Sequence, residues 1–425
     1  MAPLTPRTPP QAFNLVLDFA TSSVVVFSTA SCSNNNCNGL NVYDPSKSST
    51  WRAGKDVIPF KSGSLSTGSD IVVVGGQGAN FDFEQFPAIN IAQGVIETSL
   101  NASGVVGLGA ATAPPGNFSL PLLYYLSKGW TDKSFGLYMA RTRKTVNDTL
   151  LSAAKGPGGS LTLGVIASKI NYVPLLNLNS PAPVWAVPLD GLLVQGKALR
   201  SVEGEASPLA VPNAGSLFIL APPSWVDEFY SHIEHSFKIS YPSGSYSWVF
   251  PALAINISNA NAPANNPAST LFQLVLGGQS YPMADADFVY QTLSAWDLVN
   301  RFKAQRSQAA PSPLWVFGTL QPIPDNVQPA AGHTPAIYLG SSFLKNVYSS
   351  YRFTGPDGPA AVGFARLKPE AGAPVAPVTY SYTRPAGTGT SSAKPTASST
   401  KGGDARANRV AARFVLCAAA VAALL

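Results

Sequence analysis

Charged residues are scarce in this chain of 425 residues: Asp, Glu, Lys and Arg together make up 12%, about half of the usual share. Apolar residues nevertheless make up 45%, which is enough for a sizeable core. With so few charges, Ser, Thr, Asn, Gly and Pro must supply most of the polar surface. This composition is typical of β-rich secreted or cell-surface proteins, and it argues against a helical cytosolic enzyme.

The body of the chain also lacks an excess of either charge, although the formal net charge is +6. From Arg384 onward there are six Lys or Arg and one Asp, so 22 basic and 21 acidic residues remain before it. The positive charge is therefore a property of the tail. A basic face for nucleic acid is not expected, and nucleic acid is excluded from the expected partners.

Cysteine and histidine are rare, with three of each. Cys417 lies in the last apolar stretch, whereas Cys32 and Cys37 are five positions apart in one Asn-rich segment. So few ligands supply a zinc site poorly, and we expect no metal and no cofactor. A local disulfide between Cys32 and Cys37 would place the protein in an oxidising compartment, and two free thiols in a loop are the alternative.

A long apolar run is missing from the N-terminus, where Met1 is followed by a Pro-rich segment without the apolar core of a signal peptide. This conflicts with the secretory features of the chain. We therefore expect either a truncated N-terminus or a misassigned start codon.

The C-terminus has the pattern of a lipid-anchor signal. Residues 371–403 are rich in Ala, Pro, Ser, Thr and Gly and read as an extended stalk, and residues 404–425 end in 12 apolar residues. That run is too short to span a membrane, but after a polar spacer and small residues it indicates a GPI anchor attached at Gly403. A terminal membrane-surface helix and a disordered end are the alternatives. Four sequons for N-glycosylation support the secretory route: Asn101, Asn117, Asn147 and Asn256.

Up to about residue 370 the chain reads mostly as strands, because β-branched and aromatic runs alternate with Gly, Pro, Asn and Ser. The expected strands are 14–17, 24–27, 71–74, 104–108, 161–165, 192–194, 218–220 and 272–276. Helical spacing predicts helices over 120–127, 223–236 and 293–303.

An ordered set of motifs occupies the first half of the chain. Thr8–Gln11 (TPPQ) leads into an apolar strand that ends at Asp18, and Tyr43–Thr50 (YDPSKSST), Phe60–Leu65 (FKSGSL) and Gly104–Gly109 (GVVGLG) follow. This order resembles that of pepsin-like aspartic peptidases, in which the strand ends in Asp-Thr-Gly-Ser-Ser. In that family the third segment is a flap, and the fourth crosses beneath the active-site loop.

The second half repeats the pattern, as the internal duplication of that family requires. Trp185–Gly191 (WAVPLDG) resembles the strand that opens the second lobe, and Ala210–Pro222 (AVPNAGSLFILAP) resembles the second Asp-Thr-Gly loop. Ile337–Tyr348 and Val362–Ala365 resemble the late segments. The resemblance implies an all-β, bilobal acid protease fold with two related β-barrel-like lobes, residues 1–175 and 176–370, and a cleft between them.

The departures from the family pattern are concentrated in the catalytic segments. Such peptidases need two carboxylates that share one proton around a water. Asp18 stands at the first position, but Asn213 stands at the second. The hydroxyls that brace the pair in the family are replaced by Phe19 and Ala214, and Phe60 replaces the flap tyrosine.

A further departure is Ala20, which replaces the glycine of the first loop. Because an amide cannot exchange a proton near neutral pH, we expect a catalytically inactive protein. Asp18 would then serve either as a strand-end carboxylate that binds nearby backbone N–H groups or in some remaining chemistry.

The sequence therefore predicts a monomeric, GPI-anchored protein of the plasma membrane or cell wall that binds a peptide or glycan in its cleft without cutting it. Its stalk and anchor signal resemble those of fungal surface aspartic peptidases. An active pepsin-like endopeptidase, working at acid pH, is the alternative. A purely structural wall protein is the third interpretation.

Overall fold

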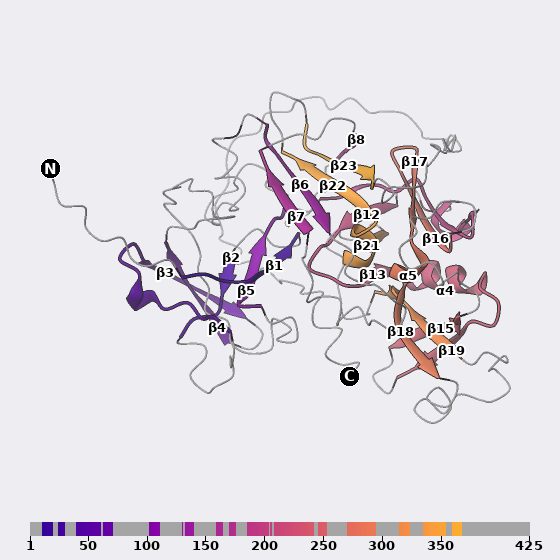
Figure 1. Cartoon of the computed structure of the whole chain (residues 1–425), viewed down its shortest axis with the longest axis horizontal. Coiled ribbons are helices and arrows are strands. Elements are labelled where there is room, and N and C mark those ends of the chain that lie inside the picture. Colours follow the sequence, from indigo (N-terminus) through magenta and orange to yellow (C-terminus); the bar gives the residue numbers. More distant parts are fainter. Residues whose placement is uncertain are drawn as a thin grey trace, which may run out of the picture.

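The computed structural model describes a set of segments from both halves of the chain. They are residues 11–19, 24–29, 40–60, 63–70, 102–110, 130, 132–139, 159–164, 170–175, 185–203, 205, 208–241, 245–252, 270–294, 314–323, 335–353 and 359–367. In these segments strands predominate and helices are short, as an all-β bilobal fold requires (Figure 1).

The first half contains a small sheet in the order β1-β5-β2. Its strands are β1 (Leu15–Asp18), β2 (Val24–Val26) and β5 (Gly104–Gly107). Strand β5 runs parallel to β1 and antiparallel to β2. Strand β5 therefore lies between β1, which ends at Asp18, and β2. A separate hairpin consists of β3 (Arg52–Phe60) and β4 (Gly63–Ser69).

The second half repeats this arrangement. Strand β21 (Ala336–Leu339) runs parallel to β12 (Leu209–Pro212) and antiparallel to β13 (Ile219–Ala221). The sheet is completed by β20 (Leu320–Pro322) and β9 (Val187–Pro188). The two halves are thus related by an internal duplication, in which β12, β13 and β21 correspond to β1, β2 and β5.

A five-stranded sheet contains strands from both halves, in the order β7-β6-β22-β23-β8. Figure 1 shows β6 and β7 beside β22 and β23 in the upper part of the molecule. The bounds are β6 (Ser134–Met139), β7 (Gly159–Leu163), β8 (Asn171–Pro174), β22 (Val347–Arg352) and β23 (Ala361–Arg366). Because β6 pairs directly with β22, this sheet joins the two halves.

Two further sheets and the helices complete the second half. One sheet contains β10 (Gly191–Val194), β11 (Lys197–Ala198), β16 (Phe272–Leu276) and β17 (Gln279–Met283). The other contains β14 (Phe237–Ser240), β15 (Tyr246–Pro251), β18 (Val289–Ser294) and β19 (Leu314–Gly318). Within the described segments of this half, the helices are α3 (Arg200–Glu203), α4 (Pro223–Ser231), α5 (Asp285–Phe288) and α7 (Ser341–Leu344). A 3-10 turn, η1 (Pro45–Lys47), belongs to the first half.

Helix α4 confirms one sequence prediction and corrects its length. Trp225 and Phe229 are fully buried on one face, as their spacing indicated, but the helix ends at Ser231 rather than at residue 236. Between the end of α4 and β14, which begins at Phe237, His235 adopts a positive φ of 60°, a conformation that does not continue a right-handed helix.

The prediction of a helix over 293–303 is wrong at its start. Leu293 and Ser294 lie in β18 and pair with Trp315 and Leu314 of β19. Leu293 is buried in a small cluster with Trp315 and Phe317, and this long-range pairing overrides the local helical spacing. Residues 295–303, like the predicted helix over 120–127 and the predicted strand over 71–74, lie outside the described segments.

One cluster of buried apolar side chains runs through both halves. It includes Phe19 and Leu108 from the first small sheet, Phe135 and Tyr351 from the five-stranded sheet, and Trp185 from the start of the second half. Because burial of apolar area is the main favourable term in folding, this shared core holds the two halves against each other.

Candidate active site

Asp18 is the last residue of β1 and pairs with Gly107 of β5. Its carbonyl oxygen accepts a hydrogen bond of 2.7 Å from the N–H of Leu108. The side chain is half-buried. The parallel pairing with β5 therefore fixes the backbone that carries this carboxylate and brings it to the edge of the first small sheet.

Asn213 occupies the corresponding place in the second half, directly after Pro212, the last residue of β12. Its N–H donates a hydrogen bond of 2.9 Å to the carbonyl of Leu339 in β21, and its carbonyl accepts one of 3.1 Å from Ser216 N–H. The side chain is 4% exposed, and within the described segments its Oδ1 has no hydrogen-bond partner. A buried acceptor without a donor costs about 1–3 kcal/mol.

The two loops touch each other at Gly215. A Cβ atom placed on Gly215 would lie 3.0 Å from Oδ1 of Asp18 and 3.4 Å from its Cβ and Cγ. The absence of a side chain therefore allows the second loop to approach the carboxylate of the first. The structure thus brings together Asp18 and the Asn213–Gly215 segment, which are almost 200 residues apart in the sequence.

A second carboxylate for the pair is not supplied by the other nearby acids along the sequence. Asp190 accepts a hydrogen bond of 2.8 Å from Gly278 N–H. Asp227, on α4, accepts hydrogen bonds from Lys238 at 2.7 Å, Tyr246 at 3.0 Å and Trp248 at 3.1 Å. Both carboxylates serve local contacts of their own.

Phe19 and Ala214 both face apolar surroundings. Phe19 is 2% exposed, and its ring lies 4.6 Å from that of Tyr351. Ala214 is half-buried and packs against the same core cluster. Neither residue can donate a hydrogen bond across the site from its side chain, so the two loops are joined here by packing.

The β3–β4 hairpin carries the residue predicted to replace the flap tyrosine. Phe60 ends β3 and pairs with Gly63 of β4, directly at the turn of the hairpin. The segment that resembles the flap thus lies at the end of a hairpin. The structure describes the backbone of Phe60 but not its side chain.

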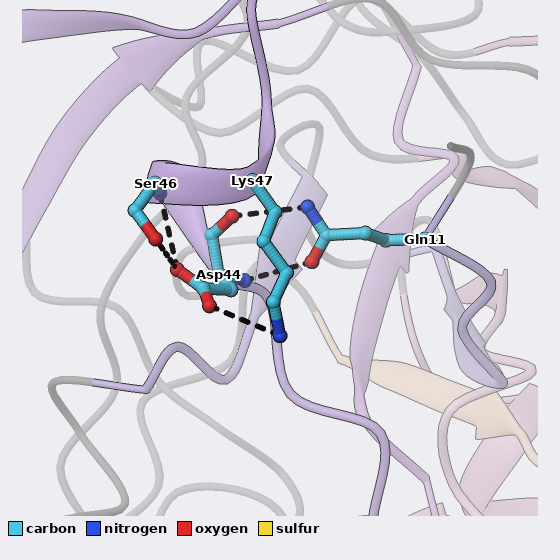
Figure 2. A network of polar contacts seen from close by, with 4 residues as sticks. All are labelled: Gln11, Asp44, Ser46 and Lys47. Atoms are coloured by element: carbon cyan, nitrogen blue, oxygen red, sulfur yellow. Dashed lines mark hydrogen bonds and ion pairs between the residues drawn. The ribbon is translucent and has the colours of Figure 1, made fainter. Parts of the chain in front are cut away.

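The first two motifs of the sequence bind each other. Gln11 donates from Nε2 to the carbonyl of Asp44 at 3.0 Å and accepts from Asp44 N–H at Oε1 at 2.8 Å (Figure 2). Asp44 caps the turn η1 through Ser46 N–H at 3.0 Å and contacts Lys47 at 3.3 Å. Hydrogen bonds from Ser46, with a contribution from Lys47, lower the pKa of Asp44. The side chain of Gln11 thus ties the segment before β1 to the turn.

Several predicted site residues lie outside the described segments, so the structure neither pairs nor places them: Ala20, Cys32, Cys37, Asn101, Asn117, Asn147, Asn256 and Gly403. Among the residues that are described, His, Cys, Asp and Glu form no group of three that could hold a metal ion. Within the same ranges, no helix combines the length and apolar character needed to cross a membrane.

Sequence reasoning missed a hydrogen bond that links the second half to the segment after β5. The indole N–H of Trp185 donates a hydrogen bond of 2.7 Å to the carbonyl of Leu108, the residue after β5. In the sequence Trp185 belongs to a motif that opens a strand, but the motif indicates no partner for its side chain. No periodic signal in the chain connects positions 77 residues apart, so this contact could be found only in the structure.

The duplicated three-stranded arrangement, with a loop after β1 facing a loop after β12, defines a bilobal all-β protein of the pepsin type. The family model described as eukaryotic aspartyl protease matches residues 2–366, and the chain belongs to that family.

Two fungal proteins are similar to this chain. "Major aspartyl peptidase 1" of Cryptococcus neoformans var. grubii is 24% identical over 380 residues, which cover 85% of this chain and 67% of that protein. "Probable aspartic-type endopeptidase opsB" of Aspergillus fumigatus is 25% identical over 282 residues, which cover 63% of this chain and 55% of that protein. The chain thus spans about half to two thirds of the length of these relatives.

Proposed function

We propose that this chain is an inactive member of the aspartyl protease family that binds a peptide or glycan between its lobes without cutting it. The observation that carries the proposal is the identity of residue 213. The loop after β12 approaches the Asp18 carboxylate, as a working pair requires, but it carries an amide. An amide cannot serve as the second acid or base, and loss of a central catalytic group lowers rates by about 10⁴-fold or more.

The ordered backbone around the site supports a binding role for it. Asn213 is held by backbone hydrogen bonds on both sides, and Gly215 preserves the close approach to Asp18. A half-buried carboxylate beside this loop can accept hydrogen bonds from the N–H or O–H groups of a peptide or a sugar.

The same proposal includes the cell surface as the place of action. The composition, the four sequons, the pair Cys32 and Cys37, and the anchor signal at Gly403 support an extracellular, GPI-anchored glycoprotein. The active endopeptidase remains the second candidate, because the two similar proteins are named as peptidases and Asp18 is retained.

The first test is proteolysis of a denatured protein substrate by the purified chain over roughly pH 2 to 6, where carboxyl groups titrate. We expect cleavage no faster than that by Asp18→Ala, with circular dichroism showing that both proteins are folded. Cleavage that disappears in Asp18→Ala would overturn the proposal. Gain of activity in Asn213→Asp would locate the defect at that amide.

Binding is tested separately, by thermal shift with a panel of peptides and of wall-type oligosaccharides. A ligand of the site should lose about tenfold or more in affinity in Asp18→Ala, because a hydrogen bond to a charged group contributes about 1.5–3 kcal/mol. Asp190→Ala is the matched control, since Asp190 bonds Gly278 instead. Equal loss in both variants, or no ligand at all, would contradict the proposed binding role.

A further inference from the structure

A series of contacts starts at the ring of Phe19 and leads back to its neighbour Asp18. Its ring packs at 4.6 Å on Tyr351, which stacks on Phe135 at 4.7 Å with an interplanar angle of 14°. Trp185 meets Tyr351 nearly edge-on, at 5.2 Å and 64°. Tyr351 belongs to β22 and Phe135 to β6, so the ring of Phe19 rests on the sheet that joins the two halves.

The series closes through two backbone hydrogen bonds. The indole N–H of Trp185 donates to the carbonyl of Leu108 at 2.7 Å, and the N–H of Leu108 donates to the carbonyl of Asp18 at 2.7 Å. Asp18 is therefore held from one side through its own carbonyl and from the other through its neighbour Phe19. Every aromatic member of this series is buried.

We propose that Phe19 is a positioning residue: it fixes the Asp18 loop to the sheet between the lobes through the Phe135–Tyr351–Trp185 cluster. This apolar contact replaces the side-chain hydroxyls that positions 19 and 214 lack. The inference concerns the placement of Asp18, so it holds whether the site binds a ligand or cuts one.

The packing also explains why threonine at position 19 would not restore a hydroxyl brace. The side chain of residue 19 lies among Phe135 and Tyr351, where a Thr hydroxyl would be buried against rings. A buried hydroxyl without a partner is unfavourable, and the smaller side chain would leave a cavity. Phe19→Thr should therefore loosen the loop rather than repair the site.

The test is amide hydrogen exchange at Leu108, whose N–H bonds Asp18, in the full chain. Phe19→Leu should raise the exchange rate of this amide by about tenfold or more relative to amides of β16 and β19, because the loop opens locally. Phe364→Leu is the matched control: Phe364 is as buried as Phe19 and belongs to the five-stranded sheet on which Phe19 packs, but its ring partner is Tyr281. That variant should lose stability without selective exchange at Leu108.

A milder variant keeps the test decisive if Phe19→Leu fails to fold. Trp185→Phe retains a ring but removes the N–H that holds Leu108, and it should also raise exchange at Leu108. Where Phe19→Leu does fold, its effect and that of Trp185→Phe should be less than additive in the double variant, because both residues act through the same series. Selective exchange that is no faster in Phe19→Leu than in Phe364→Leu, or unchanged in Trp185→Phe, would overturn the proposal.

Discussion

At the scale of the residue, the proposal of an inactive site depends on Asn213. Its side chain is almost fully buried, and its Oδ1 finds no donor among the described residues. Asp18, by contrast, faces no second carboxylate in the loop that approaches it.

Asn213→Asp should make the stability of the protein depend more strongly on pH. Burial and the nearby Asp18 charge would both raise the pKa of the new carboxyl in the folded state above its unfolded value of about 3.9. The variant should then match the parent most closely below about pH 4 and lose about 1.4 kcal/mol per unit of pKa difference as pH rises through the folded value.

Urea denaturation of parent and variant at several pH values measures this effect. Asn14→Asp is the control, because residue 14 is exposed and its new carboxyl should titrate as in the unfolded chain. If Asn213→Asp and Asn14→Asp change stability equally between acid and neutral pH, neither burial nor the charge of Asp18 acts on the carboxyl at position 213.

At the scale of the element, the end of β21 packs closely against the segment between β12 and β13, and this packing depends on Gly340. This residue follows β21, and a Cβ on it would lie 2.1 Å from the carbonyl oxygen of Phe218. The neighbouring backbone is fixed, because Ser341 N–H donates to Ser216 and Ser342 N–H donates to Leu217. The close approach therefore cannot be relieved by a side chain moving away.

Gly340→Ala should destabilise the protein by about 3 kcal/mol or more, since overpacking against backbone forces a backbone shift. Gly278→Ala is the comparison: Gly278 has a positive φ of 73°, but a Cβ added to it would meet no atom within 4 Å, so this variant tests backbone conformation alone. That variant should lose about 1–2 kcal/mol. Chemical denaturation measures both, and a smaller loss in Gly340→Ala than in Gly278→Ala would contradict the packing argument.

At the scale of the whole molecule, buried tyrosines link stability to alkaline pH. Burial raises the pKa of the phenols of Tyr43, Tyr172, Tyr230, Tyr241, Tyr281 and Tyr351. At Tyr43, a hydrogen bond from the phenol to Asp70 raises the pKa further. These side chains come from both halves and from the sheet between them. Four of them, Tyr43, Tyr230, Tyr281 and Tyr351, belong to the shared core, so their ionisation disturbs it.

Stability should stay constant up to about pH 10 and fall above it, because the phenols ionise first in the unfolded chain. Each contribution is fully present below the unfolded pKa and is lost as pH rises through the higher folded pKa. Urea midpoints between about pH 8 and 11, with absorbance of tyrosinate, measure this. Tyr351→Phe should reduce the alkaline loss, and full ionisation of the tyrosines in a protein that keeps its native stability would contradict it.

The sequence by itself determined the family, the order of the motifs and the identity of the residues at the two loop positions. It also singled out Asp18, Asn213 and Phe60 as candidate site residues, because short motifs depend on local backbone requirements, which a linear pattern preserves. The sequence also located helix α4 through the spacing of its buried residues, although not its end at Ser231.

Tertiary structure alone decided the contacts between distant segments. The approach of Gly215 to Asp18, the bond from Trp185 to Leu108 and the packing of Phe19 on Tyr351 join positions from 77 to more than 300 residues apart. Leu293 belongs to a strand for the same reason, because pairing with Trp315 outweighs its local helical spacing. Packing depends on neighbours in space, and no local pattern of residues specifies which neighbours a side chain meets.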